Sequence, residues 1–112
     1  MLRRKMKKFK LRKYIVKKDT ERNTALEYLD PVAGEAVIWP AGGKVQAELY
    51  GLRLAYMLNM NYYGDLNISE NDAICINIDE PEYKVVSIKS YPKFKFIELE
   101  KLRWHFKMRI NS

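Results

Sequence analysis

Short runs in which apolar and polar residues alternate divide most of the chain, and turn-forming residues separate one run from the next. The clearest run places Ile74, Ile76 and Ile78 on one face and Cys75 and Asn77 on the other. A period of two is typical of a β-strand that buries one face. By this criterion we predict strands over residues 9–16, 35–39, 53–62, 73–78, 83–89 and 94–99. Strands at this spacing predict a mainly β protein, folded as a small antiparallel β-barrel or sandwich.

Three segments allow more than one interpretation. Residues 53–62 alternate strictly but are rich in Leu, Ala and Met, which favour helix. We interpret them as a strand because Gly51 and Gly64 bracket the run. Residues 44–51 are compatible with a short amphipathic helix, a strand or an ordered excursion. Residues 100–110 combine helix formers with alternating bulky apolar side chains, so a helix, an edge strand and a docking tail all stay open.

The chain has 112 residues, which is enough for one hydrophobic core and short for a second domain. We predict a basic N-terminal arm over residues 1–8, a single β-barrel domain over residues 9–102 and a C-terminal tail over residues 103–112. Residues 17–25 are polar and should form a hairpin-like connection or a loose loop. The side chains expected to be mostly buried are those of Val37, Leu54, Ile74, Ile76, Val85 and Ile88.

The net charge of +7 is unevenly distributed. Residues 1–18 carry ten lysines and arginines and no acid, so the rest of the chain is slightly acidic, at −3. A protein that wraps nucleic acid along its fold normally has a basic face on the fold itself, whereas here the charge is concentrated in an appendage. This arm either contacts DNA phosphates, docks onto an acidic neighbouring subunit, or is a solvated tail. Its candidate contact residues are Arg3, Arg4, Lys5, Lys7, Lys8 and Lys10.

The sequence offers no convergent set of acid, base and nucleophile. The single histidine, His105, is expected to be a packed or surface residue. The single cysteine, Cys75, falls within a predicted strand, where a buried and inert thiol is expected. Asp79, Glu80 and Glu82 are interpreted as a solvated hairpin tip and not as a cation site. We therefore predict a protein that is not an enzyme and that needs no cofactor and no metal.

The compartment follows from the cysteine count and from the apolar runs. A lone cysteine cannot form an intrachain disulfide, which fits a reducing environment. The N-terminal segment lacks the apolar stretch of a secretory signal, and no apolar run is long enough to span a bilayer. The chain is therefore expected to be soluble and intracellular when made, with no membrane partner.

Aromatic side chains bear on a nucleic-acid-binding role. RNA-binding barrels normally expose aromatic rings beside basic groups on one face. Here the aromatics mostly lie on the apolar faces of the predicted strands, as core residues would: Tyr56, Tyr62, Tyr83, Phe94 and Phe96. A small basic β-barrel that binds nucleic acid is therefore the second hypothesis.

The order of the strand and turn signals resembles that of a known family. It runs from Glu35-Ala-Val-Ile-Trp-Pro40 through a loop and Gly51 into a long strand, then through Ile68-Ser-Glu-Asn-Asp72 to Tyr83-Lys-Val-Val-Ser-Ile88. Over residues 9–102 this pattern resembles the head-completion, or stopper, proteins of long-tailed bacteriophages. The long basic N-terminus and the Trp-His-Phe tail depart from the pattern, so contacts made by either end cannot be carried over.

The resemblance implies a structural function in the head-to-tail connector of a phage or phage-like particle. It implies a small β-barrel that forms a twelve-subunit homo-oligomeric ring below the portal and its adaptor, closes the DNA channel and provides the surface to which the tail attaches. The protein would be assembled in the host cytoplasm and reside in the virion. Its partners would be the adaptor, portal and tail proteins, with non-specific contact to packaged DNA.

In that family the loop after the strand that ends in proline points into the axial channel and helps retain packaged DNA. By position this loop corresponds to residues 40–51, and the candidate gating residues are Pro40, Gly42, Gly43, Lys44, Gln46, Tyr50 and Gly51. Gly42 and Gly43 allow the backbone to reposition, and Pro40 fixes where the strand stops. Lys44 and Gln46 are expected to face DNA phosphates, and Leu49 and Tyr50 to anchor the far end of the loop.

Overall fold

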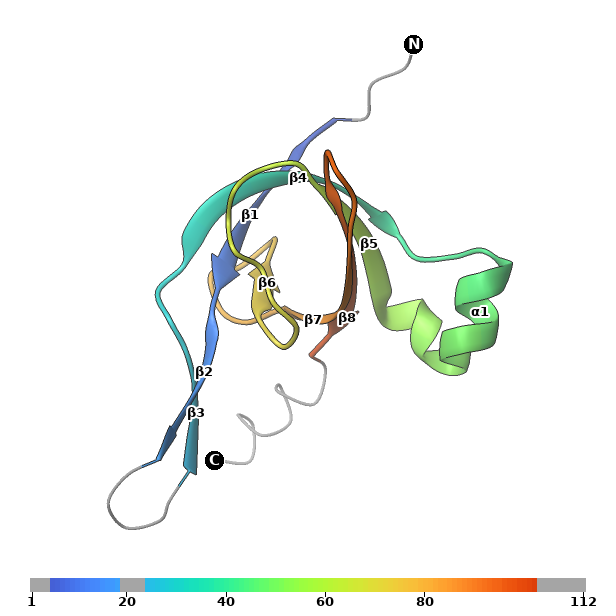
Figure 1. Cartoon of the computed structure of the whole chain (residues 1–112). Helices are drawn as coiled ribbons and strands as arrows, with labels where there is room; N and C mark the ends of the chain where they lie inside the picture. Colours follow the sequence, from blue (N-terminus) through green and yellow to red (C-terminus); the bar gives the residue numbers. More distant parts are fainter. Residues whose placement is uncertain (1–4, 19–23, 103–112) are drawn as a thin grey trace.

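The computed structural model describes residues 5–18 and 24–102, and within them the chain folds mainly as an antiparallel β-barrel (Figure 1). The strands neighbour one another in the order β1-β4-β5-β8-β7-β6, and β6 pairs with β1 to close the barrel. The all-β prediction is therefore confirmed, as a barrel and not a sandwich. The barrel strands are β1 (Lys7–Arg12), β4 (Val32–Pro40), β5 (Met57–Tyr62), β6 (Ala73–Cys75), β7 (Tyr83–Ser90) and β8 (Lys95–Lys101).

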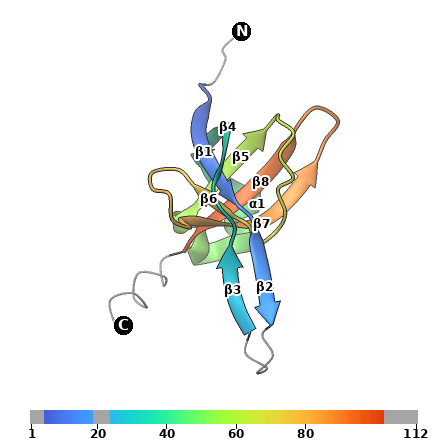
Figure 2. The same ribbon diagram turned by 90° about the vertical axis from the view of Figure 1, so that its left-hand side faces the viewer.

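A separate two-stranded hairpin, β2 (Tyr14–Lys18) with β3 (Thr24–Tyr28), projects from one end of the barrel (Figures 1 and 2). The predicted strand over residues 9–16 is thus divided at Lys13 between the barrel and this hairpin. A hydrogen bond from the Leu29 amide to the Lys13 carbonyl oxygen, 2.8 Å from N to O, holds the base of the hairpin. Arg12 adds to this attachment, because its Nε donates to the Leu29 carbonyl at 2.8 Å.

The core fills the barrel with side chains from all six strands and from the loop before β6. Ile74 and Val85 are fully buried, as predicted, and Ile76 and Ile88 pack against the core while only partly buried. The alternation rule therefore identified the inward face of β6 and most of that of β7. The buried cluster comprises Phe9, Leu11, Ala36, Ile38, Met60, Tyr62, Ile68, Ile74, Val85, Ile97 and Leu99.

Two predicted core residues do not occupy the core. In β4, Ala36 and Ile38 are buried, so Val37 lies between them on the outer face and is half-buried. The segment is apolar on both faces, and alternation alone could not show which face points inward. Leu54 lies outside the barrel strands, in a 3₁₀ helix, and is also half-buried.

The predicted strand over residues 53–62 begins only at Met57. The preceding residues form the helix α1 (Lys44–Tyr50) and the 3₁₀ helix η1 (Gly51–Tyr56). The helical preference of Leu and Ala thus prevails where the segment leaves the barrel, and alternation prevails where the segment pairs with β4 and β8. Neither of these two helices, within the part of the chain described here, is long and apolar enough to cross a membrane.

Asp72 joins the hairpin to the barrel. Its side chain is buried and accepts hydrogen bonds from the amides of Tyr14, at 2.9 Å, and Ser69, at 2.8 Å. The Lys13 ammonium lies 2.6 Å from the same carboxylate and forms an ion pair with it. A buried carboxylate needs such partners, because burial of an unpaired charge is costly. Asp72 therefore caps the turn before β6 and anchors the hairpin.

Candidate functional site

The helices α1 and η1 form an arm on the outer side of the barrel, away from β1 and β6 (Figure 1). The arm connects β4 to β5 and contains most of the predicted gating loop. Gly43 precedes α1 with φ +92° and Gly51 follows it with φ +57°, values that residues with a side chain rarely adopt. No atom lies within 4 Å of a Cβ built on either glycine, so backbone conformation and not space requires glycine there.

One face of the arm is fastened to the outer surface of the sheet by polar side chains at helical spacing. Gln46 Nε2 donates to Asn59 Oδ1 and to Glu98 Oε2, each at 2.7 Å. One turn later, the Tyr50 hydroxyl donates to Glu98 Oε1 at 2.6 Å. Arg53 then pairs with the carboxylate of Glu100 through two nitrogens, at 2.8 and 3.0 Å. These contacts fix the arm against β5 and β8.

Glu98 is the centre of this attachment. It is buried, which alone would raise its pKa, but hydrogen bonds from Ser87, Tyr50 and Gln46 favour the charged form, and the pKa lies below the ordinary value of 4.5. Burial and the hydrogen bond to Glu98 raise the pKa of Tyr50, so this phenol stays protonated as a donor. A single carboxylate therefore collects donors from α1 and β7 while belonging to β8.

The other face of the arm is apolar and exposed. Val45 is 78% exposed, Leu49 is 67% exposed, Leu52 is 94% exposed and Tyr56 is 40% exposed. Val45 and Leu49, four residues apart, lie on one side of α1, and Leu52 and Tyr56 are exposed apolar residues of η1, beyond Gly51. No side chain of α1 or η1 is buried. We call these four residues the apolar stripe.

The predicted gating loop is therefore a helical arm and not a mobile loop. Gln46 donates hydrogen bonds to Asn59 and Glu98 instead of facing open solvent, and its role toward DNA phosphates stays a prediction. Leu49 does not anchor the far end, because it points outward, whereas Tyr50 does anchor it. Lys44 is exposed at the first position of α1. Within α1, the pairs Val45 with Leu49 and Gln46 with Tyr50 each have the spacing of one helical turn, and this spacing in the sequence could have predicted both faces of α1.

The predicted basic arm is partly a barrel strand, since β1 begins at Lys7. Lys5, Lys7 and Lys8 are exposed, whereas Lys10 forms an ion pair with Asp79 at 2.8 Å. Arg3 and Arg4 lie outside the described residues, as does the predicted C-terminal tail with His105.

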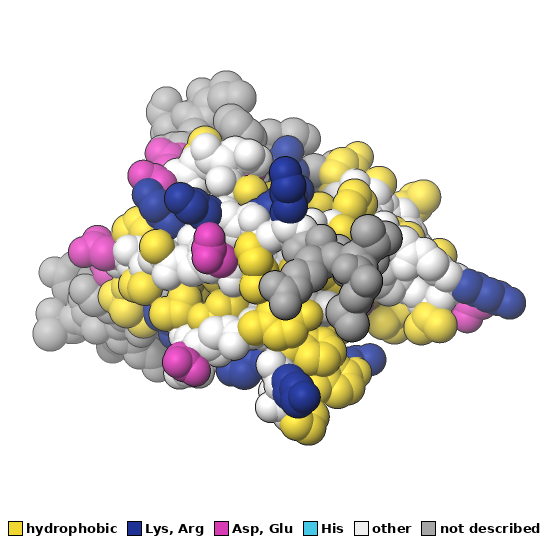
Figure 3. Space-filling model, turned by 90° about the horizontal axis from the view of Figure 1, so that it is seen from above, with side chains coloured by type: hydrophobic (Ala, Val, Ile, Leu, Met, Phe, Trp, Pro, Cys, Tyr) yellow, Lys and Arg dark blue, Asp and Glu magenta, His cyan; other side chains and the backbone are white. Residues whose placement is uncertain are grey.

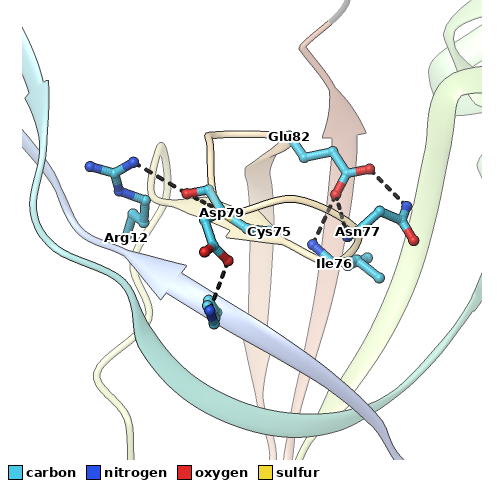
Figure 4. A network of polar contacts seen from close by, with 7 residues as sticks. Arg12, Cys75, Ile76, Asn77, Asp79 and Glu82 are labelled. Carbon is cyan, nitrogen blue, oxygen red and sulfur yellow. Dashed lines mark hydrogen bonds and ion pairs between the residues drawn. The ribbon is translucent and has the colours of Figure 1, made fainter.

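The acidic turn after β6 is occupied by contacts within the protein (Figure 4). Glu82 accepts hydrogen bonds from the amides of Ile76 and Asn77, each at 2.9 Å, and from the Asn77 side chain. Burial raises the pKa of the Cys75 thiol to about 11, so the thiol is neutral at physiological pH. Residues 5–18 and 24–102 contain no group of three or more side chains placed to hold a metal ion.

A second outer surface lies around the turn between β7 and β8 and was missed. Its rings contact one another in pairs: Trp39 with Phe96, Tyr91 with Phe94 and Tyr63 with Phe94. We call these five residues the aromatic face. Phe94 and Phe96 were expected in the core, but they are half-buried on the outside, because Ile97 and Leu99 take the inward positions of β8. Of the five aromatics predicted as core, only Tyr62 is buried.

Comparisons with known proteins identify no relative of this chain. No family model matches it, and no match was found among curated proteins or among solved structures.

Proposed function

We propose that this chain is a structural subunit of a phage head-to-tail connector, a stopper or head-completion protein that acts as a ring of identical copies. The observation that carries the proposal is the apolar stripe on an arm that is itself rigidly attached to the barrel. Large apolar side chains held in water gain free energy when covered, at roughly 25 cal/mol per Å² of surface buried. Because the arm is already fixed, little ordering entropy would oppose that gain.

A neighbouring copy offers a surface to receive the stripe. On the side of the barrel away from the arm, a groove of about 640 Å³ lies between β1, β4 and the turn after β6. Its apolar lining includes Ala33, Ile76 and the half-exposed Ile78, and the charged residues that also line it are Lys8, Lys10, Glu35 and Asp79. A contact between two different surfaces of one molecule is heterologous, and repetition of such a contact closes into a ring when the rotation allows it. The arm of one copy and the groove of the next would form this contact.

The remaining features fit the same assembly. Lys5, Lys7 and Lys8 are exposed on and before β1, and Lys44 is exposed on the arm, so each can meet DNA phosphates without reading bases. The β2–β3 hairpin projects from the barrel and offers a further surface for the adaptor, the portal or a tail protein (Figure 2). The proposed role is structural, involves no catalysis or cofactor, and belongs to the virion.

The test is assembly with the proteins encoded beside it. The gene should lie among portal, capsid and tail genes, and the chain produced with them should copurify as a ring on the portal and adaptor, seen by electron microscopy and weighed by native mass spectrometry. Leu52→Glu and Ile78→Glu should each abolish the ring by charging the two sides of the contact. Ala47→Glu is the matched control, because Ala47 is exposed on α1 but lies off the apolar stripe. If rings still form with Leu52→Glu, the proposed contact is wrong. If the gene has no such neighbours and its product stays monomeric, the proposed function is wrong.

A further inference from the structure

The aromatic face forms a pocket that the connector function does not use. The Tyr91 and Phe94 rings are stacked with centroids 5.0 Å apart, and the Trp39 and Phe96 rings lie 6.2 Å apart. Between them is a cavity of about 360 Å³, lined by Trp39, Asn61, Lys89, Tyr91, Phe94 and Phe96. Tyr91 is 48% exposed, so the rim of the pocket is accessible from solvent.

Asn61 gives the pocket an unused hydrogen-bond acceptor. Its Oδ1 atom is buried and has no hydrogen-bond partner among the described residues. Buried polar atoms are nearly always paired, and an exception marks a position where a missing partner belongs. Since Asn61 also lines the pocket, a ligand that brings an N–H group into the pocket would satisfy this atom.

The charge around the pocket is positive. Residues 83–97 contain four lysines and no acid. Lys89 lines the pocket, Lys93 lies in the turn between Tyr91 and Phe94, and Lys95 follows Phe94 directly. The next acid along β8, Glu98, is buried beneath the arm. The view from above shows hydrophobic and basic side chains side by side at the end of the barrel that carries this turn (Figure 3).

We propose that this surface binds single-stranded nucleic acid. A base enters the pocket and stacks on the aromatic rings, Asn61 Oδ1 accepts a hydrogen bond from an N–H group of the base, and Lys89 and Lys93 contact phosphates. Stacking platforms combined with cations are the usual means of holding single strands without strong sequence preference. A duplex would bind less well, because its base faces are already covered by neighbouring bases. This site goes beyond the connector function and does not depend on it.

The binding test uses the full chain and a fluorescent oligothymidine of about twelve nucleotides, a length within the usual range for one small barrel. Fluorescence anisotropy should show binding that is tighter than to a duplex of equal length. Tyr91→Ala should weaken binding by roughly fivefold or more, the low end of what one stacked base contributes. Tyr56→Ala is the matched control, since this tyrosine is similarly exposed but lies on the arm, and binding should stay unchanged.

Salt dependence separates the phosphate contacts from the stacking. Lys89→Ala should reduce the slope of log K against log salt by about 0.7, the value for one phosphate contact on a single strand. Lys101→Ala, which removes an exposed lysine at the far end of β8, should leave the slope unchanged. Failure of the oligonucleotide to bind, or equal binding by wild type and Tyr91→Ala, would overturn the proposal. A shift in oligomeric state with Tyr91→Ala, at unchanged affinity for the oligonucleotide, would assign the face to contacts between copies. Ring assembly is read separately through Leu52→Glu, so one hypothesis can fail without the other.

Discussion

The hydroxyl of Tyr50 lies 2.6 Å from Glu98 Oε1 and donates a hydrogen bond to it, which ties the end of α1 to the middle of β8. Gln46 Nε2 donates to the other oxygen, Oε2, at 2.7 Å, and Ser87 donates from β7 to Oε1. Glu98 therefore holds α1 at two of its residues, beside the contacts of Gln46 with Asn59 and of Arg53 with Glu100. This makes Glu98 the residue through which the arm can be loosened without altering the apolar stripe.

Removal of this carboxylate should release the arm. Glu98→Ala leaves the partly buried hydroxyls of Tyr50 and Ser87 without this acceptor and leaves Gln46 with Asn59 alone, which should lower the free energy of unfolding by roughly 1 to 3 kcal/mol. Arg53→Ala is the control, because the Arg53–Glu100 pair is half-exposed and pairs of this kind contribute about 0 to 1 kcal/mol. Urea denaturation measures both changes. A larger loss in the control than in Glu98→Ala would contradict the assignment.

Acid should loosen the arm as well. The pKa of Glu98 is lower in the folded chain than its ordinary value of 4.5, so the folded state favours the carboxylate. The stability from this group is therefore fully present above the ordinary pKa and is lost as the pH falls below it, through the folded pKa. Hydrogen exchange of the arm amides, followed from about pH 6 to about pH 3 and corrected for intrinsic exchange, should show reduced protection at the acid end.

Glu98→Gln is the control for the acid effect. This variant should show less change in the arm between the two pH values, since its amide does not titrate in this range. Glu82 also has a lowered pKa and supports the turn after β6. The Glu98→Gln variant should therefore still lose part of its free energy of unfolding at low pH. An arm that responds equally to acid with and without the carboxylate would exclude Glu98 as the cause.

Asp72 should be essential for the attachment of the β2–β3 hairpin. Asp72→Ala removes the acceptor of the Tyr14 and Ser69 amides and the partner of Lys13, and hydrogen bonds to a charged group contribute about 1.5 to 3 kcal/mol. The expected result is a loss of that order in thermal or urea unfolding. Asp65→Ala is the matched control, because Asp65 is exposed and substitutions of that kind usually stay within about 0.5 kcal/mol.

Valine at Gly43 should disturb the start of α1 while leaving the barrel folded. A β-branched residue at φ +92° is strongly disfavoured, and left-handed backbone costs roughly 1 to 2 kcal/mol for residues with a side chain. Gly42→Val is the control, since Gly42 has no positive φ and open space around it. In the connector assay, Gly43→Val should yield fewer rings and Gly42→Val a normal number. Equal ring yields would show that the start of the helix does not matter for assembly.

The strands were predictable where one face was apolar and the other polar. The segment after Asp72 shows this, because Ile74 lies inside as the alternation predicts. Prediction failed where both faces are apolar. Val37 and Ile38 are equally β-branched, and only the closure of the barrel decides that Ile38 points inward and Val37 outward. Likewise, nothing local shows that Phe96 is outside and Ile97 inside.

The sequence predicted which segment of the chain forms the candidate site, but it did not predict the conformation of that segment. The sequence suggests mobility at Gly42 and Gly43, whereas Gly43 and Gly51 lie at the two ends of a formed helix, with backbone angles that the residue type alone cannot reveal. Glu98 could not be predicted as the anchor, because its partners Gln46 and Tyr50 are about fifty positions away in the chain, and that distance is bridged only by the pairing of β5 with β8.

The strands that close the barrel come from distant parts of the chain, with Lys10 of β1 lying opposite Cys75 of β6. During synthesis, the β1 ladder to β6 cannot form until residues 73–75 have left the ribosome, although β7 and β8 can pair as soon as their own short turn is made. Loop-closure entropy opposes the first of these pairings far more than the second. Folding should therefore be slow for a chain of this size. The pairing of β1 with β6, which closes the barrel, should be a late step.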